Sequence, residues 1–167
     1  MQISAAQVGT VQITTVGGAA LAELDRDSAA ARFLLVLTHG AGGSVGSPDL
    51  LAARDAARPL GGLVARVTQP YRVRGARAPG SPARQDAAWA EIVAALRELA
   101  PGVPLVQGGR SNGARVACRT AAAVGARGDR AGVPAVPAGT LTRGVQGRGA
   151  ARGPRGRGQG AGGERRP

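Results

Sequence analysis

Lysine is absent from this chain of 167 residues, and cysteine, histidine, tryptophan, tyrosine and phenylalanine occur once each. Without lysine the chain cannot carry a P-loop, whose motif ends in Gly-Lys-Ser/Thr. The single cysteine, Cys118, excludes an intramolecular disulfide and is typical of a reducing compartment. Large side chains supply most of the buried area of a core, so the shortage of aromatic residues predicts a thin one.

Other absences narrow the class of protein. No apolar run approaches the length of a membrane span, and no basic segment followed by an apolar run opens the chain, so we expect a soluble cytoplasmic protein without membrane contact. The glycines of residues 40–46 do not fit a dinucleotide-binding motif, because the spacing places Val45 at the third glycine. We expect neither a cofactor nor a metal.

The 22 basic residues are all arginines, and they give a net charge of +12. Residues 1–126 hold 13 Arg against eight acids, a net +5, whereas residues 127–167 hold nine Arg against two acids, a net +7. The later segment resembles Arg/Gly-rich RNA-binding tracts, but no aromatic residue is interleaved to stack on bases. We therefore predict only non-specific, salt-sensitive attraction to polyanions, and no specific nucleic-acid partner.

Strand-like and helix-like segments alternate up to about residue 126, which favours a mostly parallel sheet with helices on both faces. Trp89, Ile92, Val93 and Leu96 form one apolar stripe at helical spacing, so Trp89 is expected in the core. Cys118 is expected to be a small buried residue. The expected strands are 10–16, 19–24, 33–38, 61–67 and 103–107, and the expected helices are 47–58, 81–99 and 112–124.

This alternation stops after residue 126. Residues 127–167 contain 12 Gly and four Pro and hardly any large aliphatic residue. Such a segment cannot bury enough surface to offset its ordering entropy, so we divide the chain into a partial domain, 1–126, and a disordered tail, 127–167. A sequence of this composition is also expected when a GC-rich gene is translated in the wrong reading frame, which suggests a frameshift or truncation near residue 125.

The clearest chemical motif is Gly109-Arg110-Ser111-Asn112-Gly113, which matches the G-x-S-x-G nucleophile elbow. It lies between an expected strand and a helix of small residues, as the elbow requires. A second motif, residues 39–43 (HGAGG), follows an earlier strand. In hydrolases with this elbow, one oxyanion-hole amide comes from the residue after the nucleophile and one from such a loop. The candidates here are the N–H groups of Asn112 and Ala41.

Residues 35–56, 64–79 and 104–121 together resemble bacterial predicted hydrolases of the α/β-hydrolase fold, similar to dienelactone hydrolases and to the testis-expressed/NSL-complex-subunit group. The likeness includes the loop Gln-Pro-Tyr-Arg at 69–72. It implies an α/β-hydrolase fold, a Ser–Asp–His triad in that chain order with Ser111 as nucleophile, and esterase- or lactonase-like acyl transfer on a small substrate. The residues expected to border that substrate are His39, Gly40, Tyr71, Arg72 and Arg110.

The chain departs from this pattern where the base is concerned. Its one histidine, His39, precedes Ser111, and the only acids after Ser111 are Asp129 and Glu164. Without a base, the serine is a weak nucleophile at neutral pH. We therefore expect the fold to lack its C-terminal strands and the enzyme to be impaired. The alternative is a catalytically inactive interaction protein with a basic tail.

Overall fold

The computed structural model describes residues 9–27 and 30–126, in which a hairpin is followed by alternating strands and helices. The strands are β1 Gly9–Thr15, β2 Gly18–Asp25, β3 Phe33–Thr38, β4 Gly62–Thr68 and β5 Leu105–Gly109. The helices are α1 Pro48–Ala57, α2 Pro70–Val73, α3 Pro82–Arg97 and α4 Asn112–Thr120, and Arg58–Leu60 forms a 3₁₀ turn. Every predicted strand and helix is present, with ends shifted by a few residues. The sequence pattern does not predict α2, because four residues are too few to show a period.

The five strands form one sheet in the order β1-β2-β4-β3-β5. β3 pairs in parallel with β4 and with β5, whereas β2 is antiparallel to both β1 and β4. Four strands therefore run in one direction and β2 runs against them. The prediction of a mostly parallel sheet is confirmed, and the hairpin accounts for its antiparallel part.

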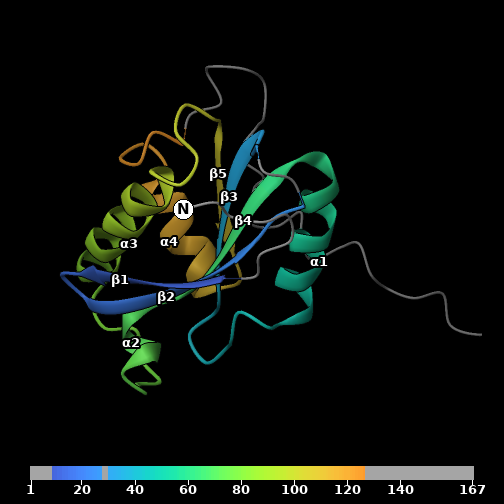
Figure 1. The fold of residues 1–167 in the computed structure, drawn as a ribbon. Coiled ribbons are helices and arrows are strands. Elements are labelled where there is room, and N and C mark those ends of the chain that lie inside the picture. The colour runs from blue at the N-terminus through green and yellow to red at the C-terminus, as the bar shows by residue number, and fades with distance from the viewer. Residues whose placement is uncertain (1–8, 28–29, 127–167) are drawn as a thin grey trace, which may run out of the picture.

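Helices cover both faces of this sheet, with α3 and α4 on one face and α1 on the other (Figure 1). The continuous apolar run of β3 follows from this arrangement, because alternate residues enter different cores: Leu34 and Val36 pack beneath α3, and Leu35 and Leu37 pack beneath α1. All four residues of the predicted helical stripe are buried, and Trp89 is only 1% exposed.

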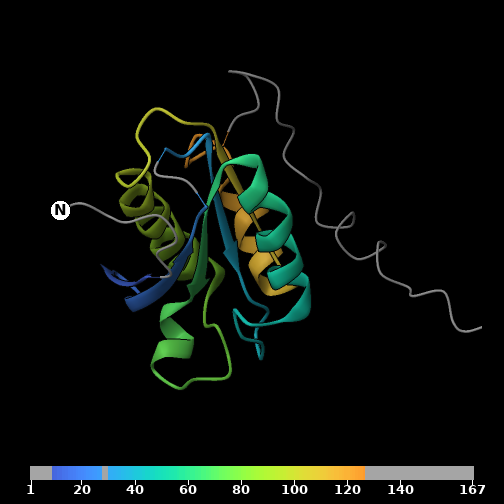
Figure 2. The same cartoon turned by 45° about the vertical axis from the view of Figure 1, so that its right-hand side comes forward.

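The carboxyl ends of β3, β4 and β5 lie at the same edge of the sheet, because these strands are parallel. The loop after β3, the helix α2 after β4 and the turn after β5 all project from that edge, at the lower end of the molecule in Figures 1 and 2. In open α/β sheets ligands bind outside the carboxyl ends of the strands, so this edge is where a site is expected.

In the part of the chain that the structure describes, β5 pairs on one side only, with β3. The predictions of a disordered tail, a frameshift and missing C-terminal strands concern residues 127–167, which lie outside the described residues, and they stay predictions. Within 9–27 and 30–126, no helix has the length and apolar character needed to cross a membrane.

Candidate active site

Ser111 occupies the sharp turn between β5 and α4. Its φ of 49° and ψ of −109° make it the single non-glycine residue with positive φ in the described chain. Such backbone costs on the order of 1–3 kcal/mol and persists only where the surroundings enforce it. The serine side chain is exposed at the edge of the sheet. This strained strand–turn–helix geometry is that of a nucleophile elbow.

Two glycines allow the turn to be this tight. A Cβ atom on Gly113 would lie 2.6 Å from the carbonyl oxygen of Thr38 and 2.7 Å from that of His39. A Cβ atom on Gly109 would lie 2.5 Å from the same Thr38 oxygen and 2.9 Å from the carbonyl carbon of Gly113. Both positions exclude a side chain because the helix start packs directly on the end of β3. The small residues of the motif are therefore a packing requirement.

The loop after β3 lies directly beside Ser111. A Cβ atom on Gly40 would be 3.4 Å from the Ser111 Cβ, and the Arg110 N–H donates to the Thr38 carbonyl at 3.0 Å. Within the loop, the Gly43 N–H donates to the Gly40 carbonyl at 3.0 Å, and the Tyr71 hydroxyl donates to the Ala41 carbonyl at 3.1 Å. The fold thus brings together two motifs about 70 residues apart, and α2 supports the loop from the other side.

The N–H group of Ala41 in this loop and that of Asn112 at the start of α4 have no acceptor among the described residues. Backbone N–H groups without a protein partner are available to bind a negatively charged oxygen. These are the two donors that the sequence motifs predict for an oxyanion hole. Their use for that purpose stays a prediction.

His39 is fully buried and holds the loop through both ring nitrogens. The ring Nδ1–H donates to the Gly40 carbonyl at 2.7 Å, and Nε2 accepts from the Gln69 N–H at 3.1 Å. These contacts define the neutral tautomer, with the proton on Nδ1. Burial and, to a lesser extent, the nearby Arg72 charge lower the pKa of the ring below its usual 6.5, although the hydrogen bond to Gly40 acts in the opposite direction. His39 therefore has no free nitrogen with which to take a proton from Ser111. The prediction that it borders the substrate stays a prediction, but the ring contacts describe a residue that positions the loop.

The other predicted substrate-binding residues lie around the same edge. The Tyr71 ring packs edge-on against the His39 ring at 5.8 Å, and burial raises the pKa of its hydroxyl. Arg72 donates to the Ala76 carbonyl at 3.4 Å. The Arg110 side chain is 58% exposed and lies 3.6 Å from the Asp49 carboxylate, so it remains accessible from solvent. Tyr71 contacts the loop beside the serine, and Arg110 directly precedes the serine in the chain. That these two residues and Arg72 border a substrate stays a prediction.

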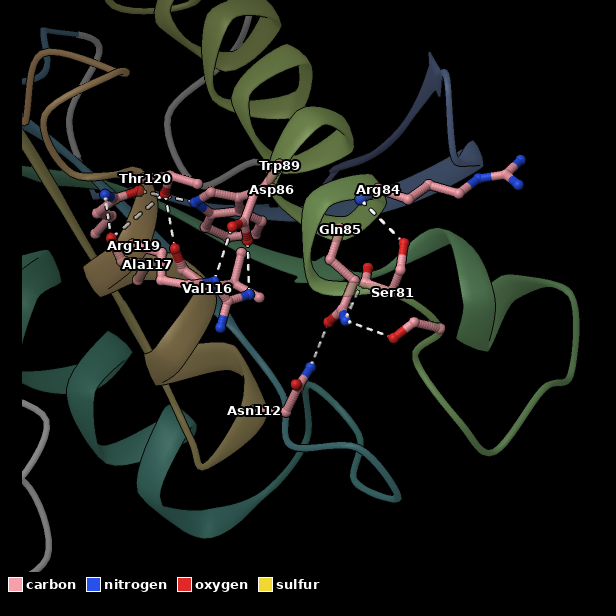
Figure 3. A network of polar contacts seen from close by, with 12 residues as sticks. Ser81, Arg84, Gln85, Asp86, Trp89, Asn112, Val116, Ala117, Arg119 and Thr120 are labelled. Atoms are coloured by element: carbon pink, nitrogen blue, oxygen red, sulfur yellow. Dashed lines mark hydrogen bonds and ion pairs between the residues drawn. The ribbon is translucent and has the colours of Figure 1, made fainter.

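Two supporting contacts could not be found from the sequence. The Asn112 side chain donates to Gln85 Oε1 at 2.8 Å, and Gln85 Nε2 in turn donates to the Gly80 carbonyl at 3.2 Å, so the start of α3 holds the start of α4 (Figure 3). On the opposite face, Arg66 binds the buried Asp25 carboxylate at 3.0 Å and donates to the Val45 carbonyl at 3.1 Å. Both contacts join residues far apart in sequence, and no local pattern marks them.

Cys118 is exposed on α4, so the expectation that it is buried was wrong. It lies on the side of the helix turned away from the packed residues Val116 and Ala117. In residues 9–27 and 30–126, no three acidic, histidine or cysteine side chains gather as metal ligands would.

A largely parallel sheet covered on both faces, with a strained serine between strand and helix beside a glycine-rich loop, defines the α/β-hydrolase fold. The chain belongs to the alpha/beta hydrolase domain family, whose model matches residues 31–143. The match continues beyond residue 126 into residues that the structure does not describe.

Solved structures with the same fold include XC6422 from Xanthomonas campestris, an α/β serine hydrolase without a lid, at 22% identity and a TM-score of 0.60. An α/β serine hydrolase homologue from Coxiella burnetii has 13% identity and a TM-score of 0.60. Est1E from Butyrivibrio proteoclasticus, solved with ferulic acid, has 17% identity and a TM-score of 0.59.

The alignments cover 75%, 72% and 68% of this chain, and 59%, 59% and 47% of those three chains, respectively. The chain therefore spans about half the length of these neighbours. At this level of identity the likeness establishes the fold alone. No curated protein sequence matches the chain.

Proposed function

We propose that this chain is a serine hydrolase that acts on a small ester or lactone through Ser111, with low activity as the sequence stands. The observation that carries the proposal is the strained backbone of Ser111, φ 49° and ψ −109°, held between two glycines that admit no side chain. Strain of this kind serves to present a side chain at the carboxyl edge of the sheet. Structural neighbours that include esterases, and Est1E with bound ferulic acid, support a small-molecule substrate.

In the proposed reaction, Ser111 Oγ forms a bond to the substrate carbonyl carbon, and the carbonyl oxygen becomes negatively charged. The N–H groups of Ala41 and Asn112 bind that oxygen. The serine proton must pass to a base, the alcohol then leaves with a proton, and water later releases the acid. Gly40 allows the substrate to approach, and Tyr71, Arg72 and Arg110 border it.

The base is the missing part. His39 uses both ring nitrogens, and no other histidine occurs in the sequence. Loss of the base lowers the rate by several orders of magnitude, although an oxyanion hole alone keeps some rate above that in water. Full activity therefore requires a base from a segment or chain that this sequence does not contain.

The absence of a base favours a second candidate function, a catalytically inactive α/β-hydrolase-like protein that binds partners. Its basic segment, 127–167, lies outside the described residues, and we predict that it attracts polyanions in a salt-dependent way.

A fluorophosphonate probe separates the two candidates, because the rate at which it labels a serine rises with the nucleophilicity of that serine. We expect slow labelling of the folded protein, lost in Ser111→Ala and kept in Ser44→Ala, which removes an exposed hydroxyl from the neighbouring loop. Absence of labelling in a folded, monodisperse sample would overturn the hydrolase proposal in favour of the binding protein.

A further inference from the structure

The first turn of α4 carries the N–H group of Asn112, which is predicted to bind the oxyanion, and this turn lacks the usual capping contact. Ser111 is the N-cap residue of α4, yet its side chain makes no capping hydrogen bond. A capping serine ordinarily accepts from an N–H group of the first turn, but Ser111 is exposed at the edge of the sheet. The start of α4 therefore needs another contact to hold it in place.

The main chain sets the direction of this N–H group. The Ser111 carbonyl accepts from the Arg115 N–H at 3.1 Å, inside the helix. In a trans peptide unit the C=O and N–H groups point in opposite directions, so the Asn112 N–H points out of the helix start. Rotation of the peptide unit between Ser111 and Asn112 would turn this donor away from the negatively charged oxygen that it is predicted to bind.

Gln85 contacts the side chain of the same asparagine (Figure 3). Its Oε1 atom accepts from the Asn112 side-chain amide at 2.8 Å. Its Nε2 atom donates to the Gly80 carbonyl at 3.2 Å and to the Ser81 carbonyl at 3.4 Å, and Gln85 is only 9% exposed. Both ends of the Gln85 amide are occupied, so the buried side chain is fixed relative to the start of α3.

A second polar contact between α3 and α4 lies further along both helices. Arg119, near the end of α4, donates to both carboxylate oxygens of Asp86, at 2.8 Å and 2.6 Å. This ion pair joins the two helices without touching the first turn of α4. It therefore offers a control in which the contact between the helices is weakened and the Asn112 side chain keeps its partner.

We propose that Gln85 is a positioning residue, which directs the Asn112 N–H at the oxyanion by fixing the Asn112 side chain. An asparagine amide released from Gln85 competes for nearby backbone groups, and the ends of helices fray. Both effects misdirect the donor. The inference rests on the proposed function, because it takes the Asn112 N–H as one of the two oxyanion donors.

Asn112 is the only asparagine in the sequence, which makes an NMR test site-specific. Protein labelled with a nitrogen isotope at asparagine alone gives one backbone N–H signal, that of the proposed donor. Phenylboronic acid supplies the anion, because its adduct forms at equilibrium even where a catalytic base is missing. The Ser111 Oγ atom bonds to boron, the serine proton passes to the buffer, and the tetrahedral adduct carries the negative charge. We expect the Asn112 N–H signal to shift, since this group gains a charged acceptor.

Gln85→Met removes both hydrogen bonds and keeps the length of the side chain. It should weaken binding of phenylboronic acid about tenfold and reduce the shift of the Asn112 N–H signal, whereas complete loss of an oxyanion donor lowers rates by about 10²–10³. Asp86→Asn is the matched control, and its affinity should stay within about twofold of the parent. Gln85→Glu keeps the acceptor for Asn112, so it should retain most of the affinity, and it covers the case in which Gln85→Met unfolds.

Equal affinity and an equal signal shift in Gln85→Met and the parent would overturn the positioning role, as would an equal loss in Asp86→Asn. A parent protein that binds no phenylboronic acid, or whose Asn112 N–H signal does not move, would overturn it too. Failure of the hydrolase proposal has a different signature. In that case fluorophosphonate does not label Ser111, while Gln85→Met still weakens the boronate adduct and the positioning role stands.

Discussion

Gly113→Ala tests whether the turn at Ser111 is a packing requirement. On an exposed helix this change stabilises a protein by about 1 kcal/mol, because alanine has the higher helix propensity. Here the new Cβ atom would lie 2.6 Å and 2.7 Å from two backbone carbonyl oxygens and 2.8 Å from the Thr38 Cγ2 atom. Backbone atoms of β3 cannot rotate away, so the helix start must shift. Overpacking of this kind costs about 1–3 kcal/mol, and we take the upper end. The expected net loss in the free energy of unfolding is about 2 kcal/mol.

Urea unfolding followed by Trp89 fluorescence measures this loss. The matched control is Gly42→Ala in the neighbouring loop, where an added Cβ atom meets nothing within 4 Å, and its stability should stay within about 0.5 kcal/mol of the parent. If Gly113→Ala proves as stable as the parent protein or more stable, the helix start is not packed on the end of β3 as described, and the account of the elbow fails.

Three further changes probe the strain, the buried histidine and the buried ion pair. Ser111→Gly should be more stable to urea than Ser111→Ala, with a free energy of unfolding about 1 kcal/mol higher, because glycine adopts the positive φ without strain. The larger conformational entropy of glycine in the unfolded chain offsets only part of this stabilisation, and equal stabilities of the two variants would argue against strain. The pKa of His39 is lowered on folding, so the unfolded chain takes up a proton at a higher pH than the folded protein. The stability contributed by the neutral ring is therefore complete above about pH 6.5, and it falls as the pH drops, by up to about 1.4 kcal/mol per pH unit. His39→Gln should remove this pH dependence in urea titrations between pH 7 and 5, and an unchanged dependence would assign it to other groups. Asp25→Asn should cost about 2 kcal/mol, because it leaves the buried Arg66 charge with only the partly exposed Glu23 carboxylate, at 2.9 Å. Asp55→Asn in an exposed pair should change stability by less than about 0.5 kcal/mol, and similar values for the two variants would show that the buried pair contributes no more than the exposed one.

Local patterns predict most of this fold. The apolar stripe of α3 and the continuous apolar run of β3 each reflect a burial period that the backbone imposes on any helix or strand. Their ends are less certain, because caps and neighbouring packing settle the last turn: β5 is displaced by two residues from its predicted position, and α4 ends earlier than expected. Cys118 was misplaced for a related reason, since a short helix of small residues does not reveal which side faces the sheet.

The candidate site divides in the same way. Gly-x-Ser-x-Gly and the HGAGG loop are contiguous strings whose chemistry depends on main-chain groups, so Ser111, Asn112 and Ala41 can be chosen from the sequence. The residues that hold these groups in place cannot be chosen from the sequence. Gln85 reaches Asn112 from 27 residues away, and Asp25 reaches Arg66 from 41 residues away. Such contacts arise only when the sheet order places their elements side by side.

His39 shows the division most clearly. Its position in the loop follows from the chain alone, as does the absence of any other histidine. The burial of its ring, the neutral state and the hydrogen bonds at both nitrogens depend on the tertiary structure. They arise because β4 and α2 pack over the end of β3 and bring Gln69 and Tyr71 against the ring. A local string of residues thus specifies which groups are available for chemistry. Three-dimensional packing decides which of those groups remain free to react, because burial and hydrogen bonding occupy the rest.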